Sequence, residues 1–193
     1  MASSAFCFVG VSMRRIAVTG GIAEGKSTVL GYLRDAGHAV VSADVVAREV
    51  FESERVQQWL RRTFGEEAEP SREAVRVRLA KDFTFRRALN ERMHPEILRR
   101  LVASEAAFVE IPLLFETCSQ RTFDRVWVVT CGPEEQLRRL ESRLGDAAKA
   151  AELLGTQLPT RAKCALADRI VRTNAPEDAV QRKSVEAAIV DVG

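Results

Sequence analysis

Short apolar runs alternate with longer amphipathic stretches along the chain. Five runs rich in Val, Ile and other apolar residues are typical of buried strands, and they cover residues 15–19, 39–41, 107–114, 125–130 and 169–171. Between the runs, apolar side chains recur at helical spacing, as at Val29, Leu30 and Leu33. Strands that alternate with helices predict a three-layer α/β fold, in which helices cover both faces of a parallel five-stranded sheet.

Helical spacing also predicts the later helices, which cover residues 45–51, 56–64, 72–101, 133–143 and 177–190. Pro133 is suited to the first turn of its helix, whereas Pro95 lies inside an Arg-dense region and is expected to bend or restart the helix there. The last helix is expected to turn Val180, Val185 and Ile189 toward the core.

Length and charge exclude several classes of protein. The chain has 193 residues, with 29 Lys or Arg against 27 Asp or Glu, so its net charge is +2. A nucleic-acid coat protein or a polybasic membrane binder would carry a much larger excess of positive charge. The length favours one domain with a small appended part, and we expect neither a nucleic-acid nor a membrane partner.

The N-terminus and the cysteines indicate where the protein works. Residues 1–13 are apolar but carry no basic residue before the apolar part, so they do not form a secretory signal. We expect them to be a disordered extension or to follow from a misassigned start codon. The cysteines are widely scattered, without metal-ligand spacing, which favours a reducing, cytoplasmic location.

One motif carries chemistry directly. The segment 20–27, GGIAEGKS, fits G-x-x-x-x-G-K-[ST] and lies between a predicted strand and a predicted helix. In this arrangement glycines let backbone N–H groups surround phosphates, and the N-terminus of the next helix favours the same anion. We expect ATP to be held by this loop through the residues Gly20, Gly21, Ile22, Ala23, Glu24, Gly25, Lys26, Ser27 and Thr28. Lys26 would supply a charge to the phosphates, and Ser27 a hydroxyl for Mg²⁺.

The rest of the sequence narrows the class of phosphate-binding protein. None of the five Lys follows an Asn, so the guanine-reading Asn-Lys-x-Asp of a GTPase is absent. The apolar run 107–114 carries Glu110 where motor and transporter ATPases usually have an Asp. What remains fits a small kinase that phosphorylates a metabolite. Another small-molecule kinase, or a regulator that binds nucleotide without catalysis, stays open as an alternative.

Several segments resemble dephospho-coenzyme A kinases, in order and from about residue 14 to 180. The resemblance begins with IAVTGGIAEGKSTVLGYLRDAGHAVVSADVVAREVF and continues through LNERMHPEI, FVEIPLLFE, RVWVVTCGPEEQLRRLESR and LADRIVRTNA. It implies transfer of the ATP γ-phosphoryl group to the ribose 3′-hydroxyl of dephospho-coenzyme A. It also implies one kinase domain over residues 14–193, with an acceptor-binding helical insertion at about 52–102 and a lid at about 144–162. The chain is expected to act as a monomer or weak oligomer.

The resemblance also assigns roles to single residues. Asp44 matches the catalytic acid/base position, and Arg143 matches a cation that acts on the transferred phosphate. From the residues alone, Asp44 could equally be a helix N-cap. Arg139 could equally belong to the site or lie on a solvated helix face. Asn174 is expected beside the adenine. The acceptor is expected to meet His94, Pro112, Leu113 and Leu114, and Arg78 is the most favoured Arg of the insertion.

Two positions depart from the family pattern. Ser42 replaces the first carboxylate of the usual Asp-Ala-Asp, so any part of that carboxylate in Mg²⁺ coordination would pass to Ser27, Asp44 or water. Glu24 stands where the family often has a small Ser, which places an acid beside phosphates. We expect the Glu24 side chain to point outward to solvent.

Overall fold

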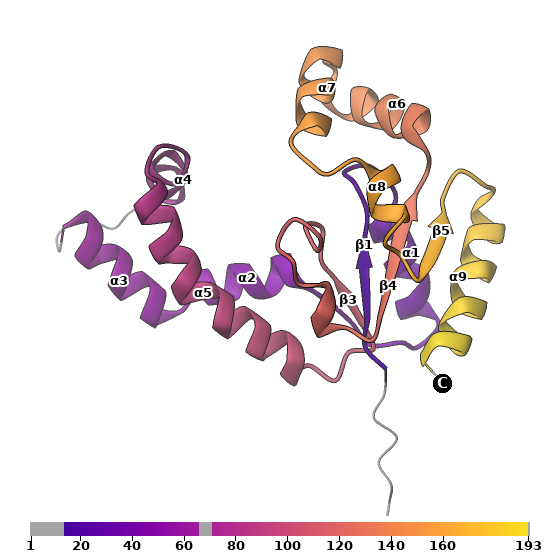
Figure 1. The fold of residues 1–193 in the computed structure, drawn as a ribbon, viewed down its shortest axis with the longest axis horizontal. Helices are drawn as coiled ribbons and strands as arrows, with labels where there is room; N and C mark the ends of the chain where they lie inside the picture. Colours follow the sequence, from indigo (N-terminus) through magenta and orange to yellow (C-terminus); the bar gives the residue numbers. More distant parts are fainter. Residues whose placement is uncertain (1–13, 66–70, 193) are drawn as a thin grey trace, which may run out of the picture.

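The structure is a computed structural model, and it describes residues 14–65 and 71–192 (Figure 1). The predictions for residues 1–13 lie outside this part of the chain. Five parallel strands form the sheet: β1 (Ile16–Thr19), β2 (Val40–Ser42), β3 (Phe108–Glu110), β4 (Arg125–Thr130) and β5 (Arg169–Arg172). Their spatial order is β2-β3-β1-β4-β5, so β1 lies at the centre. The predicted α/β fold with a five-stranded parallel sheet is confirmed.

Alternation along the strands divides the apolar side chains between two cores. Ile16 and Val18 of β1 join one core with Val29, Leu30 and Leu33 of α1 (Lys26–Asp35). The long helix α9 (Glu177–Val192) packs on the same face beside α1. Ala17 points to the opposite face, where Val109 and Val128 meet the second core. The period of two in the strands therefore produces the three layers.

Four helices make an arm that extends from one side of the sheet (Figure 1). They are α2 (Ala43–Glu52), α3 (Glu54–Phe64), α4 (Arg72–Lys81) and α5 (Phe83–Ala103). Pro95 lies inside α5, which continues through it, so the helix does not restart at Pro95. The break comes at Asp82 instead, whose carboxylate accepts a hydrogen bond of 2.8 Å from the Phe85 N–H and caps α5.

Arg78 is part of the packing of this arm. Its guanidinium lies over the rings of Phe64 and Phe85, at 5.0 and 4.7 Å from their centroids. It also donates to the Thr63 carbonyl at 3.2 Å and pairs with Asp82. These contacts join α3, α4 and α5 and occupy the side chain that was predicted to meet the acceptor. Arg78 therefore has a packing role in this arm, and its contact with the acceptor stays a prediction.

The helix after β4 leads into the region that was predicted as an excursion. α6 (Pro133–Leu144) begins at the predicted proline, and α7 (Ala147–Gly155) packs against it. The short helix α8 (Thr160–Cys164) then returns the chain to β4 and leads to β5. Figure 1 shows α6 and α7 standing beyond the end of the sheet. In the described part of the chain, every helix is too short or too polar to cross a membrane.

The C-terminal helix is anchored by an acid instead of by large apolar residues. Ile189 is 66% exposed, so its predicted place in the core is wrong, while small residues such as Ala187 and Ala188 face inward. Asp191 is 1% exposed and accepts hydrogen bonds from Trp127 Nε1 at 2.8 Å and from Arg169 Nε at 2.6 Å. Small residues let α9 lie close enough to the sheet for this buried carboxylate to reach both partners.

Replacing Asp191 should therefore destabilise the fold. In Asp191→Ala the buried indole N–H of Trp127 and the guanidinium of Arg169 lose their acceptor, so we expect the free energy of unfolding to fall by about 2–4 kcal/mol. Hydrogen bonding to Arg169 lowers the pKa of Asp191. A lowered folded-state pKa gives stability that is present above the unfolded pKa and lost as pH falls through the folded pKa. The difference from wild type should thus shrink below about pH 4.

Urea unfolding at several pH values measures this difference. Glu186→Ala, an exposed acid on the same helix, is the matched control and should change stability little. A destabilisation of Asp191→Ala no larger than that of the control would contradict the role of the carboxylate.

Candidate nucleotide and acceptor site

The phosphate-binding loop follows β1 and leads into α1. Gly20 has a φ of +150°, and a Cβ at this position would lie 2.3 Å from the Val129 carbonyl oxygen of the neighbouring strand. Gly25 has a φ of +89° and lies against Thr173. Both glycines are therefore required, as the motif predicted. Ala23 also has a positive φ, 61°, which is uncommon for a residue with a side chain.

Lys26 folds back over its own loop. Its ammonium donates to the carbonyls of Gly20 at 3.0 Å and Gly21 at 2.7 Å. Burial lowers the pKa of Lys26, and nearby Lys163 adds to this, whereas the carboxylates of Glu110, Glu24 and Asp44 oppose it. The predicted catalytic residues Lys26 and Asp44 thus lie within electrostatic range of each other. Ser27 and Thr28 follow in the first turn of α1 and are exposed.

Glu110 is a site residue that the sequence named without a role. It ends β3, between the strands that carry the loop and Asp44, and pairs in register with Val18 and Ser42. Among the carboxylates it has the largest effect on the pKa of Lys26. In the sequence, the signal for this role was an acid at the end of an otherwise apolar strand. The sequence did not show that β3 lies directly beside β1.

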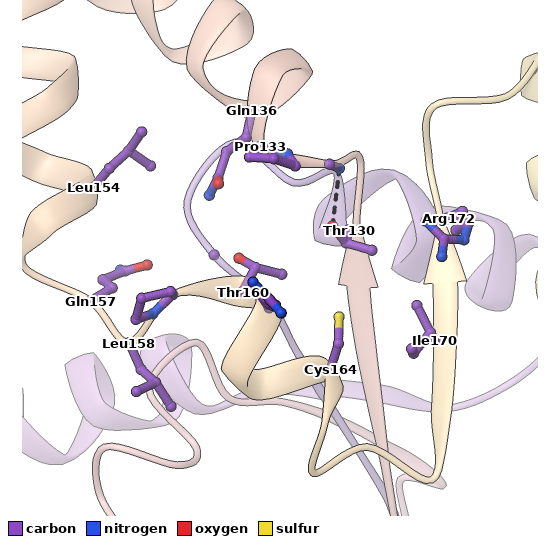
Figure 2. A pocket seen from close by; sticks show the side chains of 14 residues that line it. Thr130, Pro133, Gln136, Leu154, Gln157, Leu158, Thr160, Cys164, Ile170 and Arg172 are labelled. Carbon is purple, nitrogen blue, oxygen red and sulfur yellow. Dashed lines mark hydrogen bonds between the residues drawn. The ribbon is translucent and has the colours of Figure 1, made fainter.

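Two glutamines hold the middle of the loop. Gln136 of α6 donates to the Ile22 carbonyl at 2.9 Å, and the Gln157 carbonyl oxygen accepts from the Ile22 N–H at 3.2 Å. Both side chains line a hollow of about 480 Å³, which Figure 2 shows between the segment 154–164, α6 and the ends of β4 and β5. The same hollow is lined by Cys164, Ile170 and Arg172. The segment after α7 is therefore connected to the phosphate loop through the hydrogen bond between Gln157 and Ile22.

Glu24 does not point to solvent, so that prediction is wrong. Its side chain is 1% exposed, and its Oε2 accepts a hydrogen bond of 2.5 Å from the Cys131 N–H. The reason is that the residue after β4, Cys131, places a backbone N–H donor directly beneath the loop. This hydrogen bond offsets part of the cost of burying the carboxylate, and the sequence alone does not show that the donor is there.

A second hollow, of about 590 Å³, lies between the ends of β4 and β5. Arg139 and Asn174 line it, and the Arg139 guanidinium donates to the Thr173 carbonyl at 2.9 Å. Asn174 lies in the loop after the last strand, where it was predicted, and its contact with the adenine stays a prediction. Arg143 is exposed in the last turn of α6. Of the two arginines, Arg139 is the one that the structure places at this hollow.

The predicted acceptor residues meet at a third hollow, of about 200 Å³. Asp44, His94, Pro112 and Leu113 all line it. They come from the start of α2, the middle of α5 and the loop after β3. Leu114 differs, because it is completely buried in the core and does not face this space.

Asp44 does not cap its helix, which was the alternative reading of this residue. Ser42 occupies the N-cap of α2, and Asp44 follows in the first turn with its side chain exposed. The carboxylate is therefore free to face the hollow.

A buried ion pair joins the acceptor side to the segment after α7. Lys163 is completely buried, and its ammonium lies 2.8 Å from Glu116 Oε1 and 3.3 Å from the Pro112 carbonyl. The same Glu116 oxygen accepts from the Leu158 N–H at 3.1 Å. Burial alone would raise the pKa of Glu116, but hydrogen bonds from Lys163 and from backbone N–H groups lower it overall. This pair sets the position of the loop that carries Pro112 and Leu113.

The chain is similar to known proteins over most of its length. The family model described as dephospho-CoA kinase matches residues 14–178. The dephospho-CoA kinase of Moorella thermoacetica is 35% identical in an alignment of 190 positions, which covers 90% of this chain and 89% of the relative. A crystal structure from Thermus thermophilus superimposes with a TM-score of 0.80 at 28% identity, covering 94% of this chain and 98% of that one. The dephospho-CoA kinase of Campylobacter jejuni, at 21% identity, the same coverage and a TM-score of 0.63, shares the fold.

The Glu116–Lys163 pair yields a stability prediction. Glu116→Ala leaves a buried ammonium without its partner, so we expect the free energy of unfolding to fall by about 3–5 kcal/mol. The double variant Glu116→Leu, Lys163→Met removes both charges and should regain most of that loss. Chemical denaturation of the wild type, both single variants and the double variant measures the coupling. Additive losses without recovery would show that the pair contributes no coupling.

Proposed function

The chain belongs to the dephospho-CoA kinase family, and we propose that this site carries out the reaction of an ATP-dependent kinase of dephospho-CoA. In that reaction the γ-phosphoryl group of ATP moves to the ribose 3′-hydroxyl of dephospho-CoA, giving CoA and ADP. The observation that carries the proposal is the meeting of Lys26, Asp44 and Glu110 at one edge of the sheet in a chain matched to the family over residues 14–178.

The loop provides the binding site for the ATP phosphates. Successive N–H groups from residues 21–28 and the N-terminus of α1 would surround the β- and γ-phosphates. The Lys26 ammonium would leave the Gly20 and Gly21 carbonyls and move to the phosphates, where it would meet opposite charge. The adenine would lie in the hollow lined by Arg139 and Asn174, because this space adjoins the loop through Thr173.

The acceptor would lie on the other side of the loop. The hollow that Asp44, His94, Pro112 and Leu113 line is mostly apolar, and its polar groups are one carboxylate, the His94 imidazole and the hydroxyls of Thr117 and Ser119. A hydroxyl held there would face the γ-phosphate, and Asp44 would accept its proton or orient it as the bond to phosphorus forms. In this account the arm of α2–α5 is the acceptor-binding insertion, while Leu114 supports the hollow from the core.

The segment at about 144–162 is proposed to act as the lid. It follows Arg143 and contacts the loop through Gln157, so movement of the segment would carry Arg143 toward the transferred phosphate. A cation there would stabilise charge on the equatorial oxygens in the transition state. Closure would also exclude water, which competes with the acceptor hydroxyl.

The residues at the loop also suit Mg²⁺. This ion prefers oxygen ligands and keeps several waters, and the Ser27 hydroxyl with the carboxylates of Asp44 and Glu110 offers such a donor set. When bound, Mg²⁺ would neutralise part of the phosphate charge. Glu110 would compensate for the carboxylate missing at Ser42, since the two residues are paired in register. We further propose a cytoplasmic enzyme, monomeric or weakly oligomeric, without nucleic-acid or membrane partners.

Asp44→Asn tests the catalytic assignment. The amide keeps the size of the side chain but cannot accept the proton, so we expect kcat to fall by about 10²–10³. The affinity for ATP, measured by calorimetry without acceptor, should stay within about twofold. Asp35→Asn, an exposed change at the end of α1, is the matched control and should keep full activity. Near-wild-type turnover of Asp44→Asn would remove Asp44 from the mechanism.

The choice of acceptor needs its own experiment. Wild-type protein with ATP and Mg²⁺ is offered dephospho-CoA, shikimate, gluconate and nucleosides in parallel, and ADP formation is followed. We expect ADP to form rapidly with dephospho-CoA alone, with CoA as the product. ADP formation with another acceptor, or ATP binding without transfer to any of them, would overturn the proposal.

A further inference from the structure

Glu24 is a buried acid at the centre of a loop that binds anions. Its Oε2 accepts the Cys131 N–H at 2.5 Å, whereas its Oε1 is buried and has no hydrogen-bond partner in the described part of the chain. Burying a carboxylate is unfavourable, and an unpartnered oxygen makes it more so. A residue of this kind needs a reason beyond packing.

The first consequence of Glu24 is mechanical. Its side chain attaches the loop to the end of β4 through Cys131, and its own carbonyl accepts a hydrogen bond of 2.7 Å from the Thr173 hydroxyl at the end of β5. The residue before it, Ala23, has a φ of 61°, a conformation that is unfavourable for a side chain. These two hydrogen bonds of Glu24 therefore hold the loop in the conformation in which its N–H groups can surround a phosphate.

The second consequence is electrostatic. The pKa of the Cys131 thiol is raised to about 12, first by burial and then by the charge and hydrogen bond of Glu24. Burial and then Glu24 also raise the pKa of Cys164. Gly21, in the first half of the loop, lies close enough that a Cβ there would be 3.3 Å from Glu24 Cγ. The buried carboxylate thus acts on several groups on the underside of the loop.

We propose that Glu24 is a positioning residue that sets nucleotide affinity by two opposing effects. Its hydrogen bond shapes the loop and strengthens phosphate binding, while its negative charge repels the phosphates and weakens binding. This inference rests on the proposed function, because it requires that the loop holds the phosphates of ATP and ADP. The charge acts on substrate and product alike, so it changes affinity more than the chemical step.

Two variants separate the two effects. Glu24→Gln keeps an oxygen that can accept the Cys131 N–H but removes the charge, whereas Glu24→Ala removes both. The probe is ADP with Mg²⁺, titrated by calorimetry into wild type and variants, with thermal unfolding to monitor the fold. Glu105→Gln, an exposed acid between α5 and β3, changes the net charge equally at a distance and is the matched control.

We expect Glu24→Gln to bind ADP about three- to tenfold more tightly than wild type, as one partly screened charge near a polyphosphate predicts. KM for ATP should fall with it, and KM for dephospho-CoA should not change. Glu24→Ala should bind ADP more weakly than Glu24→Gln, because it lacks the attachment to β4. The control should match wild type.

Equal or weaker ADP binding by Glu24→Gln would overturn the charge effect, and so would a Glu24→Gln protein that does not fold. Equal affinities of Glu24→Gln and Glu24→Ala would overturn the positioning role. If wild type itself binds no ADP, the proposed function fails together with the inference. The wild-type titration therefore distinguishes the failure of the proposed function from a failure of the inference alone.

Discussion

All five strands run in the same direction, and most of the site follows from this constraint. The carboxyl ends of parallel strands meet at one edge of the sheet, so the segments that leave them are neighbours whatever their distance in the chain. The phosphate loop leaves β1, Asp44 follows β2, and Glu110 ends β3. Cys131 and Thr173 follow β4 and β5 and hold the loop from below. The residues proposed to bind ligands and the residues that support them therefore share one edge.

A balance of buried charges makes that edge able to bind a polyphosphate. Lys163 is completely buried, and burial of Lys26 together with the nearby charge of Lys163 lowers the pKa of Lys26. Glu110 beside Lys26 and Glu116 against Lys163 offset the cost of burying these two positive charges. The arrangement differs on the two sides of the loop. Lys163 is held by Glu116 and by the Pro112 carbonyl, whereas the Lys26 ammonium donates to the loop carbonyls of Gly20 and Gly21, which phosphates can replace.

The parts of the structure that depend on local pattern were predictable from the sequence. β4 has the predicted bounds, α6 begins at Pro133, and the glycines of the loop have the conformations that the motif requires. The alternation of strands and helices indicates that the strands are parallel. It was therefore also predictable that the loop and Asp44 lie at the same edge of the sheet.

The errors arose where a distant partner decides the outcome. Glu24 was expected in solvent because the Cys131 N–H that receives it comes from a strand more than a hundred residues away. Ile189 was expected in the core by its spacing, but small residues and Asp191 occupy that face of α9. The likeness to a family indicated which residues matter, and only the structure placed them.

The most direct test of the central claim is a crystal structure of the protein with ADP and CoA bound together. The account predicts that the β-phosphate of ADP lies within the loop formed by residues 20–27, in contact with Lys26. The 3′-phosphate of CoA should face it, with the Asp44 carboxylate beside the ribose 3′-oxygen and the rest of CoA along the arm formed by α2–α5. CoA bound in the hollow lined by Cys164 and Ile170, with its 3′-phosphate remote from Asp44, would contradict the account.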